Sequence, residues 1–494
     1  MPTPLRIAFC SAEVAPLAKV GGLADVAGAL PKALIGLGHD VRVFMPSYPF
    51  VERNPNVEMC LVADWFPVQI HSQWTEWLQL FRVAPDPGFP LYLVHSGGYF
   101  RGSVDSASLY ADGAYPYIVF TRALLDAVPK VEPDWQPDIL HCNDWHTGLG
   151  PAYLRSTHAG VRPWDRCAGV YTIHNVAHQG EFSREVLGHA GLPGWLFSPE
   201  YTSHYDRLNF LKCGSALCDQ CNTVSPTYAA EVQTAEFGFG LEGLYRHLAA
   251  AGRFGGIVNG IDVGAFDPAT DPALPANFCA SEPSGKALCK AELQRECGLH
   301  VDPSACLIGM VTRIADQKGF DLLAGAFDRI MAEPVQFALL GQGHPHYERL
   351  FAHELAGRYP GRVYVRLAYD AAFGQRVYAG SDLFMMPSHF EPCGLGQLIA
   401  MRYGTLPVVR ATGGLRDTVA EGDQRPGSGP GFVFWPRDPA HLADAVSRAC
   451  AAFADKPGWA RLVRRAMDAD FSWRRSASDY VDLYQRALAL RRGG

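Results

Sequence analysis

Short apolar runs alternate with amphipathic stretches along almost the whole chain, and this alternation constrains the fold more than any other feature. In the first half, "LRIAFCS" precedes a helical period that ends near Gly36, and "HDVRVFMP" follows it. The same alternation continues through "PDILHCND", "CAGVYTIHN" and "CNTVSP". Apolar strands that alternate with helices are typical of a parallel sheet covered by helices on both faces.

A second alternating series starts at "ACLIGMVTR" and runs through "VQFALLGQG", "SDLFMMPS", "LPVVRAT" and "GFVFWP". Between the two series, turn residues and prolines replace the periodic pattern in "GGIVNGIDVGAFDPATDPALP". The sequence therefore predicts an α/β fold of two doubly wound, Rossmann-like domains facing a cleft, over residues 1–257 and 258–472. The final helical run, residues 473–494, is expected to pack back on the first domain. The insertion between Tyr48 and Pro116 is expected to contain antiparallel strands.

Composition indicates the class of protein. The net charge of −7 is spread along 494 residues without basic blocks, which argues against a nucleic-acid partner. The amino terminus lacks a leader pattern and no long uninterrupted apolar stretch occurs, so we expect a cytoplasmic protein without a membrane partner. Thirteen scattered cysteines fit a reduced compartment. Cys213, Cys218 and Cys221 lie close together without a second CxxC motif, so we expect buried thiols and no metal site.

The stretch "KVGGLADVAGALPKAL" places a glycine pair before a predicted helix. Gly21 and Gly22 would let the backbone approach a ligand, and the start of the helix favours negative charge. Lys19 would add a cation nearby. The alternative is a tight turn with an exposed lysine, and the motif alone does not distinguish the two.

The second half repeats this arrangement. In "MPSHFEPCGLGQLIAMRYG" a strand ends, a loop carries Glu391, and a helix is predicted from near Gly394 to Gly404. A phosphate could bind the amides at the start of this helix. "ATGGLRDTV" then places a second glycine pair, Gly413 and Gly414, before another helix.

Two cations follow a strand in "VTRIADQKGFDLL". The strand is predicted to end at Arg313 and the next helix to start near Lys318, so both side chains can project from one edge of the sheet. There they could stabilise the charge that develops on a departing diphosphate. The alternative is a pair of solvated surface cations.

Polar residues also follow two strands of the first half. Asp144 and His146 lie in "LHCNDWHTG", and His174 lies in "YTIHNVAHQG". Such groups can hydrogen-bond sugar hydroxyls, although a histidine at the end of a strand is more often structural. Asn259, in "VNGID", lies at the predicted hinge, where a turn is the alternative role.

Taken together, the motifs resemble bacterial glycogen synthase, with plant starch synthase as a close relative. The resemblance rests on "KVGGLADV", "NDWH", "TIHN", "VNGID", "TRIADQKG", "FEPCGLGQL" and "YGTLPVVRATGGLRDTV", in family order. It implies the glycosyltransferase-B fold and the activity of an ADP-glucose:α-1,4-glucan glucosyltransferase. That reaction transfers glucose to the nonreducing end of the glucan with retention of configuration at the anomeric carbon of the glucose, and it uses no metal or other cofactor.

The resemblance also implies roles for individual residues. Lys19 and the Gly21–Gly22 turn would contact the phosphate region of the donor, and Asp144 would lie near the transferred sugar. The backbone carbonyl of His174 and the side chain of Asn259 would hold glucose hydroxyls. The other implied contacts are those of Arg313 and Lys318 with the diphosphate, Glu391 with the glucose near its 3-hydroxyl, the amides of Gly394, Leu395 and Gly396 with the distal phosphate, and Tyr369 with the adenine.

Some positions depart from the family pattern. His389 and Gly396 stand where the family usually has Arg and Thr. Ile399 stands where many retaining relatives with this fold carry a second Glu, which glycogen synthases commonly lack too. A catalytically silent glucan-binding or nucleotide-sugar-binding protein is the main alternative function. A dinucleotide oxidoreductase would need GxGxxG after the first strand, which this chain lacks. The sequence does not distinguish ADP-glucose from UDP-glucose, and it leaves the oligomeric state and acceptor length open.

Overall fold

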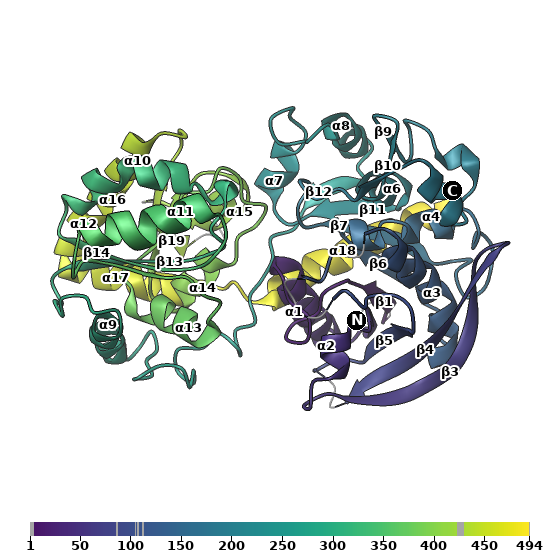
Figure 1. Cartoon of the computed structure of the whole chain (residues 1–494), viewed down its shortest axis with the longest axis horizontal. Coiled ribbons are helices and arrows are strands. Elements are labelled where there is room, and N and C mark those ends of the chain that lie inside the picture. The colour runs from purple at the N-terminus through teal and green to yellow at the C-terminus, as the bar shows by residue number, and fades with distance from the viewer. Residues whose placement is uncertain are drawn as a thin grey trace. The chain divides into compact units, whose positions relative to one another are not determined.

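The structure is a computed structural model that describes residues 4–84, 87–103, 105, 108–110, 113–421 and 429–493. The chain forms two compact units, Met1–Gly260 with Trp473–Gly494, and Ile261–Ser472 (Figure 1). The division falls three residues after the predicted one, so Asn259 belongs to the first unit. Two hydrogen bonds place the boundary here. The Val258 carbonyl accepts one from Ser476 of the first unit, whereas the Ile261 N–H donates one to the Phe471 carbonyl of the second unit.

The first unit is built on a nine-stranded sheet in the order β12-β11-β7-β6-β1-β2-β5-β4-β3. Neighbouring strands from β12 to β5 are parallel, and β5, β4 and β3 are antiparallel. Strands β3, β4 and β5 lie in the Tyr48–Pro116 insertion, which was predicted to contain antiparallel strands. The strands are β1 (Arg6–Cys10), β2 (Asp40–Pro46), β3 (Glu58–His71), β4 (Trp74–Ala84), β5 (Leu91–Ser96), β6 (Ile139–Asn143), β7 (Ala168–Ile173), β11 (Gln220–Thr223) and β12 (Phe254–Gly256).

Helices cover this sheet. The first unit also has a separate small sheet of β8 (Glu181–Phe182), β10 (Arg207–Asn209) and β9 (Ser203–His204). The carboxyl-terminal helix α18 (Trp473–Gly493) contacts α1, β7 and β11, and its Tyr484 hydroxyl hydrogen-bonds His141 Nδ1 at 2.9 Å. The other helices are α1 (Gly22–Gly36), α2 (Pro49–Glu52), α3 (Tyr115–Val131), α4 (Gly150–Arg155), α5 (Glu185–His189), α6 (Phe210–Leu217), α7 (Pro226–Glu231) and α8 (Glu242–Ala250).

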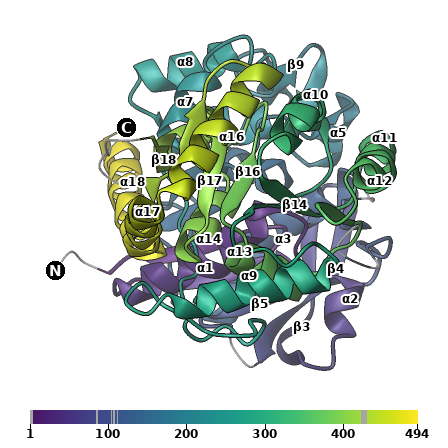
Figure 2. The same cartoon turned by 90° about the vertical axis from the view of Figure 1, so that its left-hand side faces the viewer.

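The second unit has a six-stranded parallel sheet in the order β15-β14-β13-β16-β17-β20. Figure 2 shows α10 and α16 on one face of this sheet and α9, α13 and α14 on the other. The strands are β13 (Cys306–Val311), β14 (Val335–Leu340), β15 (Val363–Arg366), β16 (Leu383–Met386), β17 (Leu406–Arg410) and β20 (Phe432–Phe434), with a separate pair β18 (Val419–Ala420) and β19 (Gly429–Pro430).

Two helices of the second unit start later in the sequence than predicted. Gly319 has a φ of 71° and follows a 3-10 turn, Asp316–Lys318, so α10 starts at Phe320 rather than near Lys318. Gly394 also has a positive φ, and α14 begins two residues later. The helices are α9 (Ser284–Glu296), α10 (Phe320–Met331), α11 (Pro345–Arg349), α12 (Ala356–Arg358), α13 (Ala371–Gly380), α14 (Gly396–Arg402), α15 (Gly413–Thr418), α16 (Pro439–Ala454) and α17 (Lys456–Asp468).

The cysteines are free thiols, and Cys213, Cys218 and Cys221 are buried, as predicted. Within the described ranges, no group of three or more His, Cys, Asp or Glu side chains is placed to hold a metal ion. None of the described helices is long and apolar enough to cross a membrane.

Candidate active site

Asp144 follows β6 of the first unit and has an unusual backbone conformation. Its φ is 53° with ψ near 180°, a combination that costs free energy for any residue with a Cβ and recurs at functional sites. Its side chain is 8% exposed, and Oδ1 accepts a 2.7 Å hydrogen bond from the His174 N–H. The predicted residues Asp144 and His174 therefore lie together at the carboxyl ends of neighbouring strands β6 and β7.

The His174 ring is fixed and neutral. Its Nε2 lies 3.0 Å from Asn143 Oδ1, while the Asn143 amide nitrogen donates to the Cys10 carbonyl. Because that second bond defines which Asn143 atom is the oxygen, Nε2 of His174 carries the proton. Burial lowers the pKa of His174 to about 3, so the ring is uncharged near neutral pH.

The Asp144 carboxyl is protonated far more readily than an ordinary aspartic acid. Burial raises its pKa to about 7; the backbone N–H groups of His174 and Asn175 oppose the shift, and the Glu13 carboxylate adds to it. In the unfolded chain the same carboxyl would titrate near ~4. The folded state therefore loses stability from this group as the pH rises from about 4 to about 7.

Replacing Asp144 by Asn removes this pH dependence, because an amide does not titrate. Relative to wild type, the free energy of unfolding of Asp144→Asn should rise by about 2–3 kcal/mol between pH 5 and pH 8. Chemical denaturation at the two pH values measures this difference, with exposed Asp134→Asn as the control. A difference that stays constant across this range would contradict the assigned protonation of Asp144.

Glu13 organises the glycine loop before α1. Its carboxylate Oε2 accepts hydrogen bonds from the N–H groups of Val20 at 2.7 Å and Gly21 at 3.0 Å, and the Tyr110 hydroxyl donates to Oε1. The Gly21 N–H is therefore already hydrogen-bonded to Glu13. The N–H groups of the first turn of α1, beginning with Gly22, remain outside the helical hydrogen-bond ladder. A Cβ built on Gly21 would meet open space, so the loop leaves room beside its backbone.

Lys19 and Asn259 complete the predicted residues of the first unit. Lys19 Nζ pairs with Asp25 in the first turn of α1 at 2.6 Å, so its charge is held at the start of that helix. Asn259 is buried, and its Oδ1 has no hydrogen-bond partner among the described residues. A buried carbonyl oxygen without a donor is costly, and such atoms are commonly satisfied by a ligand or water.

Lys318 and Glu391 form an ion pair in the second unit, 73 residues apart in sequence. Lys318 Nζ lies 2.6 Å from Glu391 Oε2, and the Ser388 hydroxyl donates to the same oxygen at 3.0 Å. Both partners follow carboxyl ends of adjacent strands, β13 and β16. The Glu391 side chain is almost buried, so Lys318 supplies the charge that compensates its carboxylate.

Arg313 and Tyr369 contrast with this pair because both are exposed. The Arg313 guanidinium makes no hydrogen bond or ion pair with any residue of the described ranges, and it lies in the same β13–α10 connection as Lys318. Tyr369 follows β15 with 77% of its surface exposed. Both side chains are therefore available to a ligand without breaking an existing contact.

The glycines of the second unit serve different purposes. Gly394 has a φ of 74°, a conformation that favours glycine, and Leu395 and Gly396 lead into α14. A Cβ on Gly396 would lie 2.9 Å from the Phe384 ring, so a Thr at this position would require the ring to shift. A Cβ at Gly413 would clash with the backbone oxygen of Glu391, and a Cβ at Gly414 would clash with that of Cys393. This second glycine pair is thus required for close packing against the Glu391 loop.

His389, the other departure from the family pattern, contacts Asp321 through Nε2 at 2.7 Å. Its backbone carbonyl accepts hydrogen bonds from Arg410 and Arg437. Arg410 also donates to the Ser388 carbonyl at 2.7 Å. These contacts fix the backbone of the Glu391 loop whatever the side chain at position 389.

Sequence reasoning missed Glu13, Asn143, Ser388 and Arg410. Glu13 and Ser388 each lie just beyond the end of a parallel strand, so position alone could have marked them as candidates. Asn143 and Arg410 are the last residues of β6 and β17, inside runs that look uniformly buried. Their roles depend on contacts with segments far away in sequence, which no local pattern contains.

Comparison with known proteins identifies the family. Residues 6–247 match the starch synthase catalytic domain and residues 305–452 match glycosyl transferases group 1. Glycogen synthase of Moorella thermoacetica is 44% identical over 100% of this chain and 99% of the relative, and that of Desulforudis audaxviator is 43% identical over 98% and 97%. The chain belongs to the glycogen synthase family. The predicted resemblance and the glycogen synthase activity that it implied are confirmed.

Two solved structures have the same fold as this chain. The catalytic domain of starch synthase IV from Arabidopsis thaliana, bound to ADP and acarbose, has a TM-score of 0.89 and 34% identity over 99% of this chain and 100% of that one. A sucrose-phosphate synthase from Thermosynechococcus elongatus shares the fold over 98% of this chain and 99% of its own. It has a TM-score of 0.60 and 19% identity. The predicted α/β fold of glycosyltransferase-B type is therefore confirmed.

Proposed function

We propose that this enzyme transfers glucose from ADP-glucose to the nonreducing end of an α-1,4-glucan with retention of configuration. The observation that carries the proposal is the Lys318–Glu391 pair together with Arg313, which lies in the same connection as Lys318 and has no partner in the part of the chain that the structure describes. This set offers two cations for a leaving diphosphate and one carboxylate for a sugar hydroxyl. The starch synthase IV structure, which contains ADP and acarbose, supports the same pair of ligand classes here.

The donor contacts are assigned mainly to the second unit. Arg313 and Lys318 bind the diphosphate, and the amides of Gly394, Leu395 and Gly396 take the distal phosphate. Tyr369, with its exposed ring, stacks on the adenine. Glu391 accepts a hydrogen bond from the glucose near its 3-hydroxyl, a role that needs the orientation given by Ser388.

The remaining sugar contacts are assigned to the first unit. The His174 carbonyl and Asn259 Oδ1, which has no partner among the described residues, hold glucose hydroxyls, and Asp144 lies near the transferred sugar. Lys19 and the Gly22 amide contact the phosphate region. This contact requires Lys19 to break its ion pair with Asp25 and pair with the ligand instead. The neutral His174 ring holds Asn143 and takes no part in proton transfer.

Front-face attack explains retention better than a covalent intermediate. The carboxylates of Glu13 and Glu391 are bound by hydrogen-bond donors or a cation, and Asp144 accepts the His174 N–H and has a raised pKa. None of these groups has the properties of a free nucleophile. We therefore assign the acceptor's proton to the leaving phosphate, whose charge Arg313 and Lys318 stabilise.

A catalytically silent glucan-binding or nucleotide-sugar-binding protein would be expected to have lost some of this machinery. Lys19, Arg313, Lys318 and Glu391 are all present, and the last two are in contact. This argues for a working enzyme.

An assay with labelled ADP-glucose and UDP-glucose, each with glycogen and with or without a chelator, tests the proposal. We expect the label to enter glycogen from ADP-glucose, at least about tenfold faster than from UDP-glucose, and without an effect of the chelator. Preference for UDP-glucose would refute the donor assignment. Loss of activity with the chelator would refute charge neutralisation by Arg313 and Lys318 alone.

A further inference from the structure

A cavity of about 830 Å³ lies in the second unit, lined by residues of α9 and α17. This volume is within the range of sites that bind small organic molecules. Much of the lining is apolar, with Trp459 and Phe453 forming an aromatic wall. Ala287 and Ala291 of α9 contribute small side chains to the opposite side, which leaves the space between the two helices unfilled.

The charged side chains around this cavity are strongly unbalanced. Five cationic side chains line it, and Asp382 is the only carboxylate among the lining residues. The cations are Lys286, Lys290, Lys456, Arg461 and Arg464. A concave site lined by charges of one sign concentrates the opposite ion, so this cavity attracts anions.

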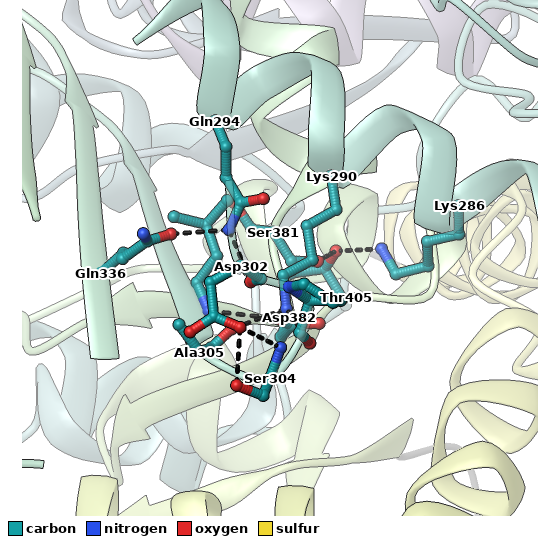
Figure 3. A network of polar contacts seen from close by, with 12 residues as sticks. Lys286, Lys290, Gln294, Asp302, Ser304, Ala305, Gln336, Ser381, Asp382 and Thr405 are labelled. Carbon is teal, nitrogen blue, oxygen red and sulfur yellow. Dashed lines mark hydrogen bonds and ion pairs between the residues drawn. The ribbon is translucent and has the colours of Figure 1, made fainter. Parts of the chain in front are cut away.

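The lysines of α9 are already engaged by the protein, as Figure 3 shows. Lys290 Nζ lies 2.7 Å from Asp382 Oδ2 and donates to the carbonyls of Pro303 and Ala305. Lys286 Nζ donates to two carbonyls and to the Thr405 hydroxyl, but has no carboxylate partner. Asp382 acts on the Lys286 ammonium without forming an ion pair with it, so the Lys286 charge is only partly compensated at the cavity wall.

The cations of α17 are open to a ligand. Arg461 makes no hydrogen bond or ion pair within the described ranges, and Arg464 donates only through Nε, to the Ala280 carbonyl at 3.3 Å. Lys456 Nζ lies over the Phe453 ring, and the carboxylate that acts on its charge is Asp382, which is already paired with Lys290. Three cationic heads thus surround an apolar space, and none of them forms an ion pair within the described residues.

The position of the cavity separates it from the proposed donor residues of the same unit. Asp382 immediately precedes β16 and Thr405 immediately precedes β17, so the network in Figure 3 lies at the amino ends of the parallel strands. Arg313, Glu391 and Gly413 follow the carboxyl ends of strands in the same sheet. The cavity is therefore at the edge of this sheet opposite to Arg313, Glu391 and Gly413.

We infer that the cavity between α9 and α17 is a second ligand site, which binds an organic anion with an apolar body and a phosphate or carboxylate head. The apolar body lies against Phe453 and Trp459, and the head pairs with Arg461, Arg464 and Lys456. The bound anion also compensates the charge of Lys286. Burial lowers the pKa of Lys286 to about 8, and a neighbouring anion would raise that pKa again.

Isothermal titration of the full chain with phenyl phosphate tests this inference. Wild type should bind phenyl phosphate at least about tenfold more tightly than inorganic phosphate or benzyl alcohol, which carry only the head or only the body. Saturating ADP should leave this binding unchanged, because the cavity is apart from the proposed nucleotide residues. Equal affinity for benzyl alcohol, no binding of phenyl phosphate, or its displacement by ADP would each overturn the inference.

Two variants locate the binding. The double variant R461E/R464E should weaken phenyl phosphate binding at least about tenfold by reversing the charge around the cavity. Ala287→Trp, at an exposed position of α9, should do the same by filling the space without adding charge. Arg246→Glu, an exposed arginine of α8 in the other unit, is the matched control and should bind like wild type. Wild-type affinity in either test variant would place the ligand elsewhere and refute the site.

Discussion

Arg313→Ala is expected to lower kcat by about a hundred- to a thousandfold while the free energy of unfolding stays within about 0.5 kcal/mol of wild type. The Arg313 side chain is exposed and has no partner in the described ranges, so the folded enzyme loses no contact with it. Its proposed task arises only when negative charge develops on the departing diphosphate. A large effect on turnover without an effect on stability is the signature of such a residue.

Lys318→Ala should lower kcat by a similar factor, but it should also destabilise the second unit. Removing Lys318 leaves the nearly buried Glu391 carboxylate with Ser388 as its remaining side-chain partner. Such an uncompensated carboxylate costs about 3 kcal/mol. The two variants therefore separate the electrostatic contribution to turnover from the contribution to folding.

Steady-state kinetics, glucan binding and chemical denaturation of both variants measure these effects. Arg349→Ala, which removes another exposed arginine of the second unit, is the matched control and should leave all three unchanged. If Arg313→Ala weakened glucan binding as much as it lowered kcat, the diphosphate role would be wrong. The same conclusion would follow if Arg313→Ala kept wild-type turnover.

The fold could be predicted from the sequence because its signal is local. The runs that became β6, β7, β13 and β16 are short and apolar, and each is followed by polar residues at the carboxyl end of its strand. Parallel topology then brings these loops to one edge of each sheet. Asp144 with His174, and Lys318 with Glu391, could be nominated from this rule without knowledge of any contact.

The contacts themselves could not be predicted, because they depend on tertiary structure. The two glycine pairs show the difference: Gly21 has open space beside it, whereas Gly413 lies against the backbone of Glu391. Both read as the same motif in the sequence. Likewise, nothing local indicates that Glu13 takes the N–H of Gly21, because that bond joins a strand end to a loop eight residues later.

The Glu391 loop itself is held by close backbone packing. Gly319 approaches it from the β13–α10 connection, where a Cβ would lie 2.1 Å from the Pro387 oxygen. Gly413 approaches from α15, where a Cβ would lie 1.9 Å from the Glu391 oxygen, and the Gly414 N–H donates to that oxygen at 3.1 Å. Both Gly319 and Gly413 also have positive φ. A side chain at either position must therefore move the loop that carries Glu391.

Gly413→Ala is accordingly expected to lower kcat by at least about a hundredfold and the free energy of unfolding by about 2–4 kcal/mol. Gly319→Ala, which displaces the other end of the same loop, should give a similar result. Gly357→Ala is the matched control, since it lies in exposed α12 with open space around a built Cβ, and it should be neutral or slightly stabilising. Kinetics at a temperature where all variants are folded, together with denaturation curves, measure both effects. If Gly413→Ala lost stability but kept wild-type kcat, the position of Glu391 would not limit turnover, and its assignment to the transferred glucose would have to be abandoned.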